Sequence, residues 1–66
     1  MTKILNLVFQ TSNVTICYGR NGHRLYKGPK ENIPEYLLNY YVGIQIINEA
    51  TNSTYIEVTE DAKFWE

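Results

Sequence analysis

The chain has 66 residues, a net charge of −1 at pH 7, 44% hydrophobic residues and 14% aromatic residues. This apolar content excludes a disordered tail, and the length fits a single small domain over residues 1–66. The near-neutral charge predicts no strong partner of either sign. Cys17 is the only cysteine, which excludes an internal disulfide and a cysteine-based zinc site.

The apolar stretches of the sequence are too short to cross a membrane. Ile4 to Phe9 is also too short for the hydrophobic region of a secretory signal, and Asn6 interrupts it. With one cysteine and no such signal, a reducing compartment fits best. We therefore expect a cytoplasmic protein without membrane contact.

The N-terminal segment Lys3–Gln10 is dense in branched and aromatic residues and predicts a strand. Because side chains alternate along a strand, Leu5, Leu7 and Phe9 would share one face. The polar residues 11–13 are numerous enough for a loop to the next strand.

The following segment predicts a β-hairpin. Val14–Tyr18 alternates, and Asn21-Gly22 is the strongest short signal for a type I′ turn with positive φ at both residues. The second strand of the hairpin ends at Gly28-Pro29. The turn sets the expected register, which pairs Arg20 with His23, Tyr18 with Leu25, Cys17 with Tyr26 and Ile16 with Lys27.

A helix is expected next. Asn32 can cap a helix that begins at Pro34 and runs to about Tyr41 or Val42, and Gly43 supplies the exit. A helix of about nine residues is not stable alone, so packing on a sheet must hold it.

The segment after the helix predicts a second hairpin. Ile44–Ile47 and Thr54–Val58 are alternating strands joined by a polar turn, with Ile56 and its neighbours two residues away on one face. The expected layout is β-β-β-α-β-β. We therefore predict an α+β fold, a small antiparallel sheet of four to five strands with one short helix packed on a face.

Groups for catalysis or metal binding are sparse. His23, the only histidine, is expected at an exposed hairpin tip, and no serine or cysteine has a base at a recognisable spacing. Glu57 and Glu60 could form a carboxylate pair, although a solvated strand end explains them more simply. Patterns for metal ligands and for a phosphate-binding loop are missing. We expect a protein that is not an enzyme and holds neither a cofactor nor a metal ion.

Basic residues gather in the first hairpin. Arg20, Arg24 and Lys27, with Tyr26 among them, could grip a phosphate backbone and stack a base. The electrostatic footprint of such a cluster is small in a near-neutral chain. The same side chains could instead protect an edge strand from aggregation. Nucleic-acid binding through this hairpin is therefore the alternative function.

The expected helix carries more apolar surface than one small sheet can cover. Leu37, Leu38 and Tyr41 are enough to fill the part of the helix that a small sheet can bury. Tyr36 and Tyr40 are then left beside Glu35, and paired aromatic rings next to a carboxylate could anchor another protein. A hairpin of the same chain or a homodimer interface could cover them instead.

Four short pieces of the sequence follow one another: NVT at 13–15, YKG at 26–28 after a glycine-bearing turn, EY at 35–36 followed by Tyr40, and an apolar strand. Over residues 13–48 they resemble the small uracil-DNA glycosylase inhibitors of Bacillus podoviruses. The resemblance implies a dimeric protein that occludes the DNA-binding groove of a host repair enzyme, with Glu35, Tyr36 and Tyr40 at the contact. This chain differs in an additional N-terminal strand and in a smaller net charge than a DNA mimic carries.

The leading hypothesis is a non-catalytic protein-binding module, a phage-type inhibitor that occludes the working surface of a host enzyme in the host cytoplasm. The aromatic pair near the C-terminus could close over the sheet or bind the partner. A self-assembling structural protein is a third hypothesis. The expected contact residues are Glu35, Tyr36, Tyr40, Phe64 and Trp65.

Overall fold

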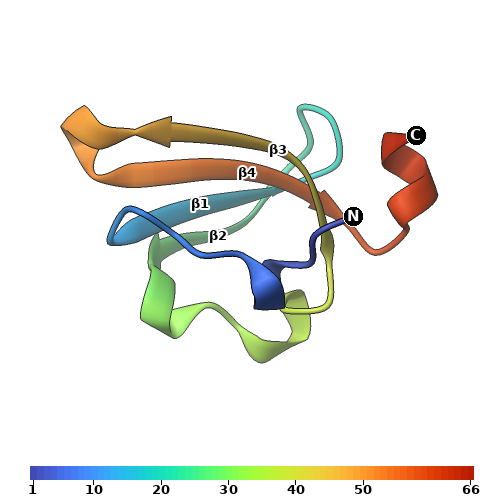
Figure 1. Ribbon diagram of the computed structural model, residues 1–66, viewed down its shortest axis with the longest axis horizontal. Helices are drawn as coiled ribbons and strands as arrows, with labels where there is room; N and C mark the ends of the chain where they lie inside the picture. The colour runs from blue at the N-terminus through green and yellow to red at the C-terminus, as the bar shows by residue number, and fades with distance from the viewer.

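The computed structural model describes residues 1–66 and consists mainly of one four-stranded sheet (Figure 1). Its strands are β1 (Asn13–Tyr18), β2 (Arg24–Pro29), β3 (Tyr41–Asn48) and β4 (Ser53–Thr59), in the order β2-β1-β4-β3. The other elements are 3-10 helical turns: η1 (Ile4–Asn6), η2 (Lys30–Asn32), η3 (Glu35–Leu37), η4 (Glu49–Thr51) and η5 (Ala62–Trp65).

Both expected hairpins are confirmed, but the expected antiparallel sheet is wrong. β1 pairs with β2 and β3 pairs with β4 in antiparallel fashion, whereas β1 and β4 are parallel, so the sheet is mixed. A hairpin joins neighbouring segments and shows in local patterns. The β1–β4 pairing joins distant segments, and no local pattern specifies it.

The loop of the first hairpin differs from the expected type I′ turn. Asn21 has a positive φ of 56°, but the second positive φ, 62°, belongs to Gly19 rather than to Gly22. Gly22 is required for a different reason, because a Cβ there would lie 1.6 Å from the carbonyl oxygen of Tyr18. The glycine therefore allows a close backbone approach.

The expected register of this hairpin is also wrong, by one residue at Ile16 and by two at Cys17. Ile16 lies opposite Tyr26 rather than Lys27, and the pairing is irregular beyond Ile16. A bulge places two residues of one strand against one residue of its partner. As a result, Leu25 and Tyr26 both pack against the core.

The N-terminal segment is not a strand. It forms η1 and then an extended stretch outside the sheet, and only Lys3 makes an isolated bridge, to Tyr41. The turn changes the spacing of inward side chains from two residues to three. Ile4 and Leu7 therefore reach the core, while Leu5 remains exposed.

The expected helix from Pro34 to about Tyr41 is also wrong. The chain passes through η2 and η3 and enters β3 at Tyr41, with Ile33 and Pro34 extended at ψ values of 126° and 138°. This segment must cross from β2 at one edge of the sheet to β3 at the other (Figure 1). An extended residue spans about 3.3 Å and a helical residue about 1.5 Å, so extended backbone makes this crossing with fewer residues. No helix in the structure is long and apolar enough to span a membrane.

Tertiary hydrogen bonds occupy the residues that would have formed the last helical turn. The carbonyl of Tyr40 accepts from the N–H of Ile4 at 3.0 Å, and the N–H of Val42 donates to Thr2 at 2.8 Å. Aromatic and β-branched residues favour strands over helices. Local preference and tertiary pairing therefore both favour β structure at residues 40–42.

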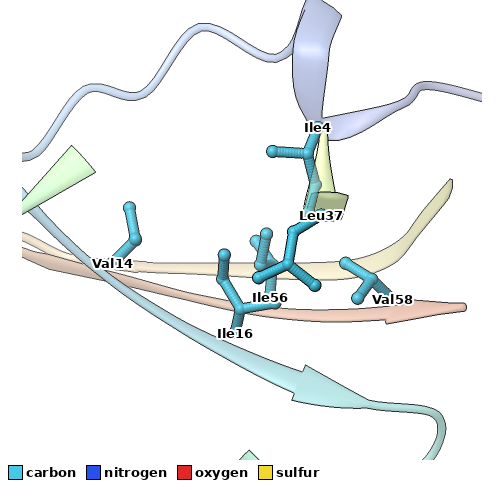
Figure 2. Close-up of a cluster of buried hydrophobic side chains, with 6 residues drawn as sticks. All are labelled: Ile4, Val14, Ile16, Leu37, Ile56 and Val58. Carbon is cyan, nitrogen blue, oxygen red and sulfur yellow. The ribbon is translucent and has the colours of Figure 1, made fainter. Parts of the chain in front are cut away.

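The core lies between one face of the sheet and the segments that cross it. Ile4 and Leu37 extend from the crossing segments toward the apolar side chains of β1 and β4 (Figure 2). The predicted alternation of the last strand is confirmed, because Thr54, Ile56 and Val58 have no exposed surface. The fully packed cluster consists of Ile4, Val14, Ile16, Leu37, Ile56 and Val58.

Leu37→Ala should lower the free energy of unfolding by about 2–5 kcal/mol, because it removes a fully buried side chain and leaves a cavity. Leu5→Ala is the matched control, since 59% of Leu5 is exposed, and should cost about 0.5 kcal/mol or less. Urea denaturation followed by circular dichroism measures both. Equal costs would mean that the crossing segment does not pack on the sheet.

Candidate functional site

The predicted contact residues Glu35, Tyr36 and Tyr40 lie on η3 and just after it. Tyr36 is 63% exposed and Glu35 is exposed beside it, whereas Tyr40 is half-buried and packs against the core. The rings of Tyr36 and Tyr40 meet edge to face, with centroids 6.4 Å apart and planes at 82°. The structure therefore brings the three together, with one ring available to a partner and the other supporting it.

Two further rings extend this pair into an aromatic row, which we define as Tyr36, Tyr40, Tyr18 and His23. Tyr18 meets Tyr40 edge to face at 6.4 Å and stacks on His23 at 5.7 Å. The hydroxyl of Tyr18 donates to the carboxylate of Glu60, and this hydrogen bond raises the pKa of Tyr18. The row is thus continuous with the core at Tyr40 and reaches a carboxylate at Tyr18.

The C-terminal pair Phe64 and Trp65 does not join the aromatic row. Trp65 lies over Gly43, where a Cβ would come within 2.0 Å of its ring, and its indole N–H donates to the carbonyl of Tyr41 at 3.3 Å. The guanidinium of Arg20 lies over both rings, 5.8 Å from the centre of Phe64 and 5.3 Å from that of Trp65. Trp65 is half-buried on β3, whereas Phe64 stays 45% exposed, and Figure 1 shows their turn apart from η3.

The predicted group of basic residues around Tyr26 in the first hairpin is not assembled in the structure. Tyr26 packs against the core and donates its hydroxyl to the carbonyl of Pro29 at 2.7 Å. Arg24 and Lys27 are exposed and lie opposite Cys17 and Thr15 of β1, on the face of the sheet away from the core. Arg20 lies on the C-terminal aromatic rings. Because Tyr26 packs against the core and Arg20 is held on the C-terminal rings, the predicted stacking of a base on Tyr26 between basic side chains is not formed, and this arrangement does not favour the nucleic-acid alternative.

Glu57, expected at a solvated strand end, is instead only 4% exposed. The hydroxyl of Tyr55 donates to its Oε2 atom at 2.6 Å, and the backbone N–H of Asn21 donates to the same oxygen at 3.0 Å. Glu60 bonds to Tyr18, so the two glutamates do not share a partner. These groups border a hollow of about 470 Å³ on the face opposite the core, the open-face hollow, lined by Arg20, Asn21, Ile44, Ile46, Tyr55 and Glu57.

One signal in the sequence could have located this site. Tyr55 and Glu57 are two residues apart in an alternating strand, so they share the face opposite Ile56. The burial of Glu57 follows from the central position of β4, where a strand lies on each side. The missing information was the parallel β1–β4 pairing.

The hydrogen bond to Glu57 raises the pKa of Tyr55, because a phenol that donates to a carboxylate retains its proton. Burial and the neighbouring Cys17 thiol act in the same direction. Tyr55 is therefore a fixed, neutral donor to Glu57 rather than an acid or base near neutral pH.

No protein-family model, curated protein or solved structure matches this chain. The resemblance to uracil-DNA glycosylase inhibitors therefore stays a prediction. The structure contains no group of three or more His, Cys, Asp or Glu side chains placed to hold a metal ion. A function must accordingly be argued from the contacts of the chain itself.

Glu57→Gln should lower the pKa of Tyr55, because an amide oxygen accepts the hydrogen bond without the negative charge. The folded-state pKa lies above the unfolded value of about 10. The stabilisation of the folded state by this hydrogen bond is therefore complete below about pH 10 and is lost as pH rises through the folded-state pKa of Tyr55. Ultraviolet titration of tyrosinate, with Tyr55→Phe subtracted, measures the shift. An unchanged Tyr55 titration in Glu57→Gln contradicts the assignment.

Gly43→Ala should lower the free energy of unfolding by about 1–3 kcal/mol, because the new Cβ displaces the Trp65 ring. Trp65 fluorescence should shift to the red as the indole enters water. The control is Gly43→Ala in a Trp65→Ala background, where the same change should cost little. If Gly43→Ala costs the same in both backgrounds, the ring does not rest on this glycine.

Proposed function

We propose that this protein is a small non-catalytic protein-binding module whose contact surface centres on Tyr36, with Glu35 and Tyr40. The observation that carries the proposal is the position of Tyr36, which is 63% exposed while its ring meets that of Tyr40 edge to face. Tyr40 is itself packed against the core. A supported aromatic ring loses little side-chain entropy on binding and buries a large area, as rings at the centre of interfaces do.

The charges around the aromatic row support a basic partner surface. Glu35 is exposed beside Tyr36. Further along the aromatic row, the carboxylate of Glu60 accepts a hydrogen bond from the hydroxyl of Tyr18. Carboxylates around an apolar anchor steer association toward a positively charged surface and disfavour a negatively charged one. Nucleic acid is a poor partner for such a surface, whereas the nucleic-acid-binding groove of an enzyme is a good one.

In its finer form, the proposal is a phage-type inhibitor that covers the working surface of a host enzyme of DNA repair or DNA defence. The resemblance of residues 13–48 to uracil-DNA glycosylase inhibitors supports this form, and it involves the same residues, Glu35, Tyr36 and Tyr40. The inhibitor would act in the host cytoplasm by occlusion, without chemistry of its own.

Tyr36→Ala should weaken capture of the partner by about thirtyfold or more, which corresponds to about 2 kcal/mol at a central contact. The fold should remain, because the change removes one edge contact worth about 1 kcal/mol. Val8→Ala is the matched control, since Val8 is 82% exposed and lies outside the proposed surface. Affinity capture from bacterial lysate, with quantified bound protein, measures the effect. Equal capture by wild type and Tyr36→Ala refutes the proposed surface.

The proposal that the partner is a host DNA-repair enzyme has its own test. Purified bacterial uracil-DNA glycosylase should lose activity on uracil-containing DNA in the presence of the wild-type protein, and Tyr36→Ala should restore it. Full enzyme activity with excess wild-type protein excludes this target, while the capture experiment still decides the binding module.

A further inference from the structure

The carboxylate of Glu57 has one oxygen without a hydrogen-bond partner. Both donors, the Tyr55 hydroxyl and the Asn21 N–H, reach Oε2, and both are neutral. No fully buried side-chain oxygen in the structure lacks a partner, so Oε1, which has none, keeps exposed surface, and Glu57 lines the open-face hollow. A carboxylate at this depth is strongly stabilised by a cation.

Arg20, the basic residue that lines the hollow, is engaged elsewhere. Its guanidinium lies over the rings of Phe64 and Trp65 and makes no hydrogen bond to Glu57. Cation–π contacts hold it at the rim. The negative charge at the bottom of the hollow is therefore left to an external cation.

The walls of the hollow indicate which cation fits. Ile44 and Ile46 of β3 and the ring of Tyr55 form apolar sides, and 56% of Ile46 is exposed. Lysine and arginine have apolar stems that end in a charge, and such stems lie on apolar surface while the charged end finds a polar partner. The volume of about 470 Å³ lies within the range of ligand-binding pockets.

The hollow adjoins an open sheet edge. β3 is an edge strand, and residues Ile44–Ile47 form no backbone hydrogen bond outside their pairing with β4. Its residues Tyr41–Asn48 include no charge and no proline. The opposite edge, β2, carries Arg24, Lys27 and Pro29, which disfavour strand addition. Only the β3 edge is therefore suited to accept another strand.

From the accessible Glu57 oxygen beside an unprotected β3 edge, we propose that the open-face hollow binds a lysine or arginine side chain of an extended peptide that adds to β3. The peptide belongs to another protein and pairs through its backbone, as in other strand-addition complexes. Its basic side chain passes over Ile44 and Ile46 and ends at Glu57. This surface lies on the sheet face opposite the aromatic row, so the inference does not rest on the proposed function.

A displayed library of short random peptides, selected on the immobilised wild-type protein, tests the inference. Enriched sequences should share one lysine or arginine among strand-forming residues. A synthetic lysine peptide from this set should bind about ten- to a hundredfold more tightly than its norleucine counterpart, because the carboxylate gains a charged partner. Amide resonances of Ile44–Ile47 should shift on binding.

Two variants separate the basic contact from general folding effects. Glu57→Gln should bind the lysine and norleucine peptides equally, while Glu31→Gln, an exposed glutamate on η2, should keep the lysine preference. Ile44→Lys should abolish enrichment by placing a cation of the chain itself directly opposite Glu57. Circular dichroism spectra establish that each variant is folded.

Three results would overturn the inference: a selected set without basic residues, a lysine preference that survives Glu57→Gln, or binding that leaves the β3 amides unshifted. A titration with n-butylammonium distinguishes a free amine as the ligand. If this amine shifts the resonances of Tyr55 and Glu57 and no peptide is enriched, the hollow is a small-molecule site and the peptide proposal is wrong.

Discussion

The parallel pairing of β4 with β1 is the constraint on which the rest of this structure depends. It places β4 in the centre of the sheet, where Thr54, Ile56 and Val58 lose all exposed surface on one face. It also leaves β2 and β3 as the two edges, so the chain between them must cross the sheet. That crossing covers the core with η3 and supports the aromatic row, while the opposite face keeps the hollow at Glu57.

This constraint decides how much of the fold could be predicted from the sequence. The two hairpins and the burial of Thr54, Ile56 and Val58 follow from alternation within short segments, and they were predicted correctly. The helix and the N-terminal strand were not, because the sequences around Leu37 and Leu5 fit two local structures about equally well. The choice between them was made by tertiary contacts, such as the hydrogen bond from Ile4 to the Tyr40 carbonyl.

The candidate sites, like the fold, could be predicted from the sequence only in part. The exposure of Tyr36 follows from the limited area of a small sheet, and this argument holds for a 3-10 turn as well as for a helix. The burial of Glu57 could not be predicted, because it requires a strand on each side of β4 and a loop that brings the Asn21 N–H to the carboxylate. Trp65 is held by the absence of a side chain at Gly43, and the sequence indicated that glycine only as the end of a helix.

The six tyrosines of the chain, which a contact surface or a sheet could both explain, are used unequally. Two hydroxyls donate to glutamates and one to a backbone carbonyl, so these rings fix local structure. Another ring packs on the core, and the ring that begins β3 is half-buried beside a lysine. Tyr36 alone combines high exposure with a hydroxyl that has no partner in the chain, and its one aromatic contact is with Tyr40. A large ring in that position leaves apolar surface in water and adds little to the stability of the fold. This is the physical reason to assign it to a partner. The tyrosines with structural tasks are Tyr18, Tyr26, Tyr40, Tyr41 and Tyr55.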